Sequence, residues 1–125
     1  MPQSYALKHH IMTETLVNAL ELQNFAESVF MKVGYSEADA KLIAGNLLSA
    51  DLRGVDSHGV ARLSGYLRLI KVGRINTNAK PNITHQTPST AVLDADAALG
   101  LLVATEAMKI AIEKAQQVGT GWVSV

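Results

Sequence analysis

Hydrophobic residues recur every three or four positions through three stretches of the first half of the chain, which is the period of an amphipathic helix. The first predicted helix covers residues 19–32, and its apolar face comprises Leu22, Phe25, Ala26, Val29, Phe30 and Val33. Asn18 is placed to cap the N-terminus of this helix and Gly34 to end it. We expect both Phe25 and Phe30 to lie in the core.

The next two stretches predict two further helices. Ser36 can cap a helix whose apolar stripe comprises Ala40, Ile43, Ala44, Leu47, Leu48 and Ala50. The third predicted helix runs over residues 57–72 and ends at Gly73; its buried side comprises Val60, Leu63, Tyr66, Leu67 and Ile70. Because the first two helices are joined by a very short connection, we expect them to be antiparallel neighbours.

The pattern changes after Gly73, where asparagines and a proline form a polar linker. Two short strands are predicted at 83–87 and 90–93, joined as a hairpin, and a third at 122–125. The long helix between them is predicted over 98–117, with a buried stripe of Leu101, Ala104, Met108, Ala111, Ile112, Ala115 and Val118. We expect Trp122 to belong to the core of a part of the sheet that is missing from this sequence, and His85 to lie on the surface.

These elements predict an α+β fold in which antiparallel helices precede a ββαβ unit. Residues 1–17 are interpreted as an extension, 18–75 as a helical domain and 76–125 as an α/β domain. The sequence stops inside its last predicted strand, which would leave a sheet edge and the helix stripe poorly covered. We therefore expect the second domain to be incomplete.

Composition narrows the possible functions. Lysine plus arginine and aspartate plus glutamate number 11 each, so no net charge favours nucleic acid or an anionic membrane. The absence of cysteine excludes disulfides and thiolate metal sites. His9 and His10 lack a third ligand at suitable spacing, so no metal site is predicted. No segment resembles a signal peptide or a membrane span, and a cytoplasmic protein is expected.

Residues 51–62 concentrate polar side chains between two predicted helices, where rigid neighbours would position a site. The local pattern leaves two interpretations open: Ser57 caps the third helix and His58 is its exposed first residue, or the two perform chemistry. On one helix, His58 and Arg62 would stand one turn apart, with Cα atoms about 6 Å from each other. That spacing suits a proton donor beside an arginine that binds a carboxylate.

Charged neighbours would decide the protonation of His58. A helix N-terminus and Arg62 both favour the neutral ring, so a proton donor at neutral pH would need a nearby carboxylate. Asp51 and Asp56 are the local candidates, although Asp56 could equally serve only to complement the helix dipole. Arg53 could pair with either aspartate.

The same segment carries a specific pattern, Arg-Gly-x-x-Ser-His-Gly-x-x-Arg, at residues 53–62. Ser-Ala-Asp-Leu precedes it at 49–52, and Tyr66 and a Gly-Arg-Ile-Asn sequence at 73–76 follow it. In these features the chain resembles the type-2 malate/L-lactate dehydrogenase family, which includes ureidoglycolate, sulfolactate and diketogulonate oxidoreductases and piperideine-carboxylate reductases. The resemblance covers residues 20–125.

The resemblance implies a role for each motif residue. His58 would donate or accept the proton at the substrate's oxygen or imine nitrogen, Ser57 would act beside it in a relay, and Arg62 would bind the substrate carboxylate. The implied reaction is hydride transfer between NADH or NADPH and a 2-oxo, 2-hydroxy or imino acid. The family binds this cofactor with a non-Rossmann fold, consistent with the lack of a Gly-x-Gly-x-x-Gly sequence here.

The resemblance also implies a homodimer and a longer chain. Family members continue into an Asn-His-Phe-Gly-like motif and into segments that supply most of the nucleotide site, none of which is found here. The chain is therefore expected to be an N-terminal piece that is inactive alone, with its cofactor-binding residues beyond Val125. The alternative is a non-catalytic helical interaction or oligomerisation module; a metal hydrolase is a weaker third possibility.

Overall fold

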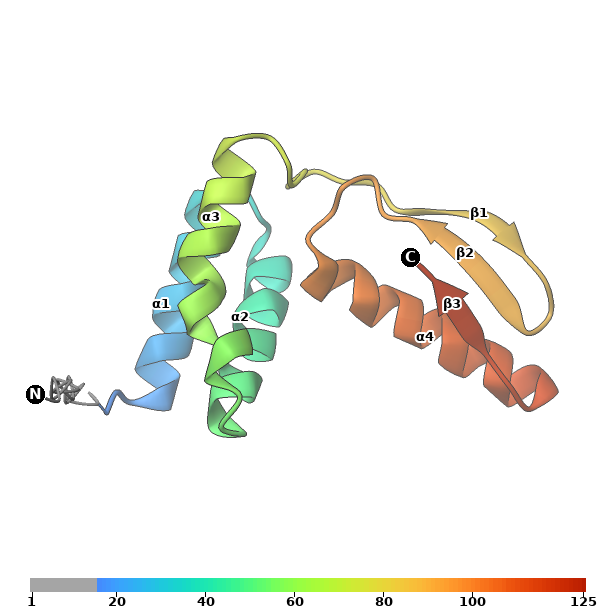
Figure 1. The fold of residues 1–125 in the computed structure, drawn as a ribbon, viewed down its shortest axis with the longest axis horizontal. Coiled ribbons are helices and arrows are strands. Elements are labelled where there is room, and N and C mark those ends of the chain that lie inside the picture. Colours follow the sequence, from blue (N-terminus) through green and yellow to red (C-terminus); the bar gives the residue numbers. More distant parts are fainter. Residues whose placement is uncertain (1–15) are drawn as a thin grey trace, which may run out of the picture.

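The computed structural model describes residues 16–125, which form four α-helices, two short 3₁₀ turns and a three-stranded sheet. Three helices stand side by side at one end of the molecule: α1 (Ala19–Lys32), α2 (Glu37–Leu52) and α3 (Leu63–Lys71) (Figure 1). The sheet and the fourth helix, α4 (Gly100–Val118), lie at the other end. The histidine pair His9 and His10 lies outside the described residues.

Capping side chains define the ends of the first two helices as the sequence predicts. The side chain of Asn18 accepts hydrogen bonds from the amides of Leu20 and Glu21, at 2.9 and 3.2 Å. Ser36 Oγ accepts from the amide of Asp39 at 3.1 Å and so caps α2. Gly34 adopts a φ of 108°, which favours glycine, and reverses the chain so that α1 and α2 run antiparallel (Figure 1).

The core of the helical end is built mainly from α1 and α2. Phe30, Ile43 and Leu47 are its largest fully buried side chains. The prediction for Phe25 is wrong, because this ring is 58% exposed. Ala26 and Phe30, one turn apart, occupy the buried face of α1, and Phe25 is rotated about 100° from Ala26 toward solvent.

The third helix begins later than predicted. Instead of one helix from Ser57, the chain makes two 3₁₀ turns, η1 (Asp56–His58) and η2 (Val60–Arg62), before α3 starts at Leu63. The break lies at Gly59, whose backbone is extended, with φ −87° and ψ −154°. His58 and Arg62 therefore lie on two successive turns and not on one continuous α-helix.

The sheet confirms the predicted ββαβ order. Strand β1 (Asn82–Gln86) pairs antiparallel with β2 (Thr90–Asp94), and β2 pairs parallel with β3 (Trp122–Ser124). Helix α4 makes the crossover between the two parallel strands and packs against the sheet (Figure 1). It ends at Gly119, whose φ is 87°. His85 is exposed on β1, as expected.

The buried face of α4 is not the predicted one. Val103 and Ala107 are 4% and 7% exposed and pack with Leu93 of β2, whereas Met108 and Ile112 of the predicted stripe are 60% and 50% exposed. The helix is apolar on more than one side, and the sheet covers only the side that carries Val103. Trp122 is 71% exposed in the described residues, and its place in the core of the missing part of the sheet stays a prediction.

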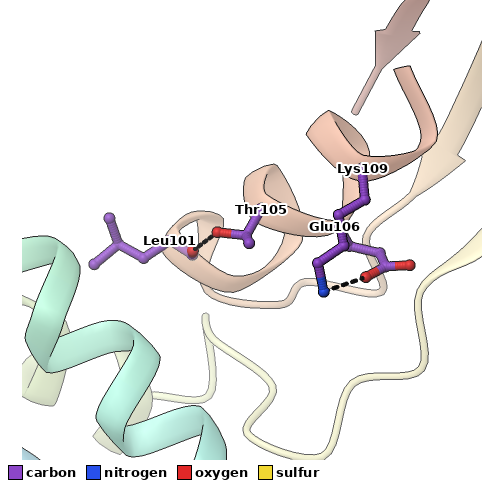
Figure 2. A network of polar contacts seen from close by, with 4 residues as sticks. All are labelled: Leu101, Thr105, Glu106 and Lys109. Atoms are coloured by element: carbon purple, nitrogen blue, oxygen red, sulfur yellow. Dashed lines mark hydrogen bonds and ion pairs between the residues drawn. The ribbon is translucent and has the colours of Figure 1, made fainter. Parts of the chain in front are cut away.

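Polar contacts support α4 on another side. Thr105 Oγ1 donates to the carbonyl of Leu101 at 3.2 Å, and Lys109 and Glu106 form an exposed ion pair at 3.7 Å (Figure 2). An ion pair of this kind contributes only about 0.2–0.5 kcal/mol to helix stability. No helix of residues 16–125 is long and apolar enough to cross a membrane.

The start of α4 joins the helical end to the sheet end. Leu99, at the start of α4, is 3% exposed and packs in the same cluster as Phe30 and Ile43. The amide nitrogen Nδ2 of Asn46 donates to the carbonyl of Leu101 at 3.2 Å. The start of α4 is therefore fixed against α2, while the boundaries of the predicted domains stay a prediction.

Candidate active site

The motif at residues 53–62 forms a double turn between α2 and α3. Arg53 caps the C-terminus of α2, and Gly54 follows in a left-handed conformation with a φ of 73°. The amide of Val55 then donates to the carbonyl of Ala50, and the amide of His58 to the carbonyl of Val55, each at 2.9 Å. These bonds hold the first turn against the end of α2.

The side chains of Ser57 and His58 contact each other. Ser57 Oγ lies 2.9 Å from Nδ1 of the His58 ring, a hydrogen-bonding distance. The hydroxyl can donate to a bare Nδ1 or accept from a protonated one, so this hydrogen bond can persist in either protonation state of Nδ1. Ser57 makes no side-chain cap for either 3₁₀ turn or for α3, so the interpretation of Ser57 as a cap is wrong.

Arg62 joins this pair through the backbone. Its Nε donates to the carbonyl oxygen of Ser57 at 2.6 Å. This bond holds the guanidinium beside the Ser57–His58 pair and uses only one of its five donor hydrogens. The terminal nitrogens remain able to bind a carboxylate with two parallel bonds. The structure thus brings the three predicted site residues together.

Asp51 has a different role from the one the sequence suggested. Its Oδ2 accepts a hydrogen bond from the backbone amide of Val60 at 2.8 Å, which ties the last turn of α2 to the second 3₁₀ turn. Asp56 is exposed. The ion pair of Arg53 with either aspartate is not formed in the described part of the chain, where the pair found is Lys109–Glu106.

The candidate site is open to solvent. Ser57, His58 and Arg62 are exposed, and none of them lines the three clefts that lie along α4. One of these clefts, of about 270 Å³, lies between α2, residues 76–81 and α4. Within those residues no three histidine or acidic side chains gather where they could hold a metal ion. The arrangement can therefore exchange a proton and bind an anion, but it does not enclose a ligand.

Similarity to known proteins now identifies the family of the chain. Residues 17–125 match the family described as malate/L-lactate dehydrogenase. The chain belongs to the malate/L-lactate dehydrogenase family. It is 48% identical over 105 residues to a malate dehydrogenase of Pyrococcus abyssi, and 43% identical over 96 residues to an L-sulfolactate dehydrogenase of Methanocaldococcus jannaschii. These alignments cover 84% and 77% of this chain but 29% and 28% of the relatives.

Solved structures agree with this assignment. The malate dehydrogenase of Pyrococcus horikoshii OT3 superposes with a TM-score of 0.84 at 43% sequence identity, over 87% of this chain and 31% of that one. The helices and mixed sheet described above therefore match the N-terminal part of a known dehydrogenase fold. The chain spans about 30% of the length of the relatives it matches.

Sequence reasoning missed how the motif is held together. The bond from Asp51 to Val60 joins residues nine positions apart, and the pattern of apolar residues carries no information about it. A signal was present in the glycine of the Ser-His-Gly sequence, which falls where an unbroken helix was predicted. A glycine inside a helical pattern is destabilising unless close packing requires it, so Gly59 could have indicated a neighbour at short distance.

Proposed function

We propose that this chain supplies the proton-transfer and carboxylate-binding groups of an NAD(P)-dependent dehydrogenase that acts on a 2-hydroxy or 2-oxo acid, or on a related imino acid. The observation that carries the proposal is the contact of Ser57 with His58 at 2.9 Å and of Arg62 with Ser57 at 2.6 Å, in a chain that belongs to a dehydrogenase family. Malate and sulfolactate, named for its relatives, are both 2-hydroxy acids.

Each residue has one task in this proposal. During reduction His58 gives a proton from Nε2 to the oxygen that becomes the hydroxyl, and during oxidation it takes that proton back. Ser57 accepts a hydrogen bond from Nδ1–H in the protonated ring and also in the neutral ring that remains after Nε2 has given up its proton. Arg62 binds the substrate carboxylate through its terminal nitrogens and so places the adjacent carbonyl near His58.

The described residues do not by themselves fit a dinucleotide. They contain no Gly-x-Gly-x-x-Gly phosphate loop. A nicotinamide cofactor would supply the hydride, and we propose that groups in the part of the relatives that this chain does not span hold it. The nucleotide, NAD or NADP, and the non-Rossmann binding fold belong to the same proposal, as does the inactivity of the isolated chain.

A chimera tests the proposed activity. Residues 17–125 replace the matching segment of the Pyrococcus abyssi malate dehydrogenase, and the change in nicotinamide absorbance is followed with 2-oxo acids and with their methyl esters. We expect turnover of the acids and a loss of at least about 100-fold in kcat/KM for the esters, because Arg62 would lose its charged ligand. A folded chimera that reduces esters as well as acids would contradict the role of Arg62.

One observation favours a second function, that of an interaction module. Met108 of α4 and Trp122 of β3 are exposed and line one cleft, and the exposed Ile112 lines a second cleft with Met108. Exposed apolar patches often mark protein contacts. We propose that two copies of the protein associate as a homodimer. Sedimentation of the 125-residue chain at several concentrations tests this: a monomer at every concentration contradicts association of the chain itself.

A further inference from the structure

The helical backbone between His58 and Arg62 is interrupted, so side-chain contacts fix the second turn against the first. One is the bond from Arg62 to the carbonyl of Ser57, and the other involves Asp51. The amide of Gly59 closes the first 3₁₀ turn on the carbonyl of Asp56, and the amide of Arg62 closes the second on the carbonyl of Gly59. Neither bond spans the junction between the turns. The amide of Val60, the first of the second turn, would lack a partner without the carboxylate of Asp51.

Gly59 shows how closely that carboxylate is packed. Its φ of −87° and ψ of −154° are open to any residue, so backbone conformation does not require glycine here. The lack of space does favour glycine, because a Cβ atom at position 59 would overlap the carboxylate of Asp51. The glycine of the Ser-His-Gly sequence is therefore matched to Asp51 and not to the turn itself.

We propose that Asp51 is a positioning residue that sets the distance between His58 and Arg62. Gly59 stands at the cap position of the second 3₁₀ turn and has no side chain to cap it. The carboxylate of Asp51, from the last turn of α2, takes this role by accepting from the amide of Val60. This inference rests on the proposed function, since the distance matters only if His58 and Arg62 act on one substrate. The role requires a hydrogen-bond acceptor at position 51 and does not require its charge.

The contact is tested first in the 125-residue chain, independently of any activity. Gly59→Ala is expected to lower the melting temperature clearly in the wild-type chain and much less in the Asp51→Ala background, because the overlap is then absent. Hydrogen exchange of the Val60 amide, measured by NMR, should accelerate at least about tenfold in Asp51→Ala and remain near the wild-type rate in Asp51→Asn. Additive effects of the two substitutions on melting, or an unchanged exchange rate in Asp51→Ala, would overturn the contact.

The positioning role is tested in the chimera. Asp51→Ala should lower kcat/KM for a 2-oxo acid by about 10- to 100-fold, and Asp51→Asn should recover most of it without shifting the pH profile. Glu113→Ala, which removes an exposed carboxylate from α4 outside the motif, is the control and should stay within about twofold. An active chimera in which Asp51→Ala behaves like Glu113→Ala would refute the positioning role and leave the proposed function standing. If Asp51→Asn is as impaired as Asp51→Ala, the charge matters and the inference is wrong.

Discussion

At the scale of single residues, Tyr35 is a polar group whose hydrogen bonding the fold leaves incomplete. The residue is 6% exposed, and its hydroxyl has no hydrogen-bond partner among the described residues. Its ring packs edge-on against Phe30, with centroids 5.9 Å apart. Burial raises the pKa of Tyr35 above its ordinary value of 10.0, and the charge of Asp39 adds to the rise.

Replacing Tyr35 should therefore stabilise the chain. An unpaired buried hydroxyl costs about 1–3 kcal/mol, so we expect Tyr35→Phe to raise the free energy of unfolding by about 1 kcal/mol at neutral pH. Urea unfolding measures this, with Tyr66→Phe, in a half-buried side chain, as the control. A decrease in stability would mean that the hydroxyl of Tyr35 has a partner after all.

The same residue predicts a loss of stability in alkali. Because its pKa is raised in the folded chain, the unfolded chain releases the Tyr35 proton first as the pH rises above about 10. The free energy of unfolding is therefore unaffected by this ionisation below that pH, and it falls as the pH rises toward the pKa of Tyr35 in the folded chain. Unfolding measured between pH 8 and about 11 should show a smaller alkaline loss in Tyr35→Phe than in the wild-type chain. Equal losses would show that other groups cause the decline.

At the scale of elements, local signals predicted helix ends well and burial less well. The bounds of α1 follow from Asn18 and Gly34, because caps act on the neighbouring backbone and depend little on distant contacts. The start of α3 differs from the prediction because two 3₁₀ turns precede it, and the second of these is bound by the carboxylate of Asp51, which lies in another helix. Likewise, which apolar side of α4 is buried depends on where β2 and β3 lie. At the site, the motif gave the three residues but not the open position of their side chains.

A pair of substitutions in α4 separates its buried side from its exposed one. Val103→Ala removes two buried methyl groups next to Leu93 and should cost about 1–3 kcal/mol of unfolding free energy. Met108→Ala removes a larger side chain that is 60% exposed and should change stability by no more than about 0.5–1 kcal/mol. Chemical unfolding of both variants provides the comparison. A larger loss of unfolding free energy in Met108→Ala than in Val103→Ala would mean that the side of α4 predicted from the sequence is the buried one.

At the scale of the whole molecule, the chain holds the three predicted site residues close together on a scaffold that spans about 30% of the length of its relatives. Three exposed residues meet where α2 gives way to α3, and the start of α4 is fixed against α2 by Leu99 and Asn46. Enzymes gain most of their rate where water is excluded around the reacting groups. An open site of this kind fits the proposal that further groups complete it.

The kcat of the chimera carrying His58→Gln tests the central claim most directly. Glutamine keeps hydrogen-bonding capacity but cannot exchange a proton near neutral pH, so we expect kcat for a 2-oxo acid to fall by about 10²–10⁴-fold. His85→Gln, which changes an exposed histidine on β1, should leave kcat within about twofold. If the His58→Gln chimera keeps the kcat of the His85→Gln control, His58 is not the proton donor and the proposed mechanism is contradicted.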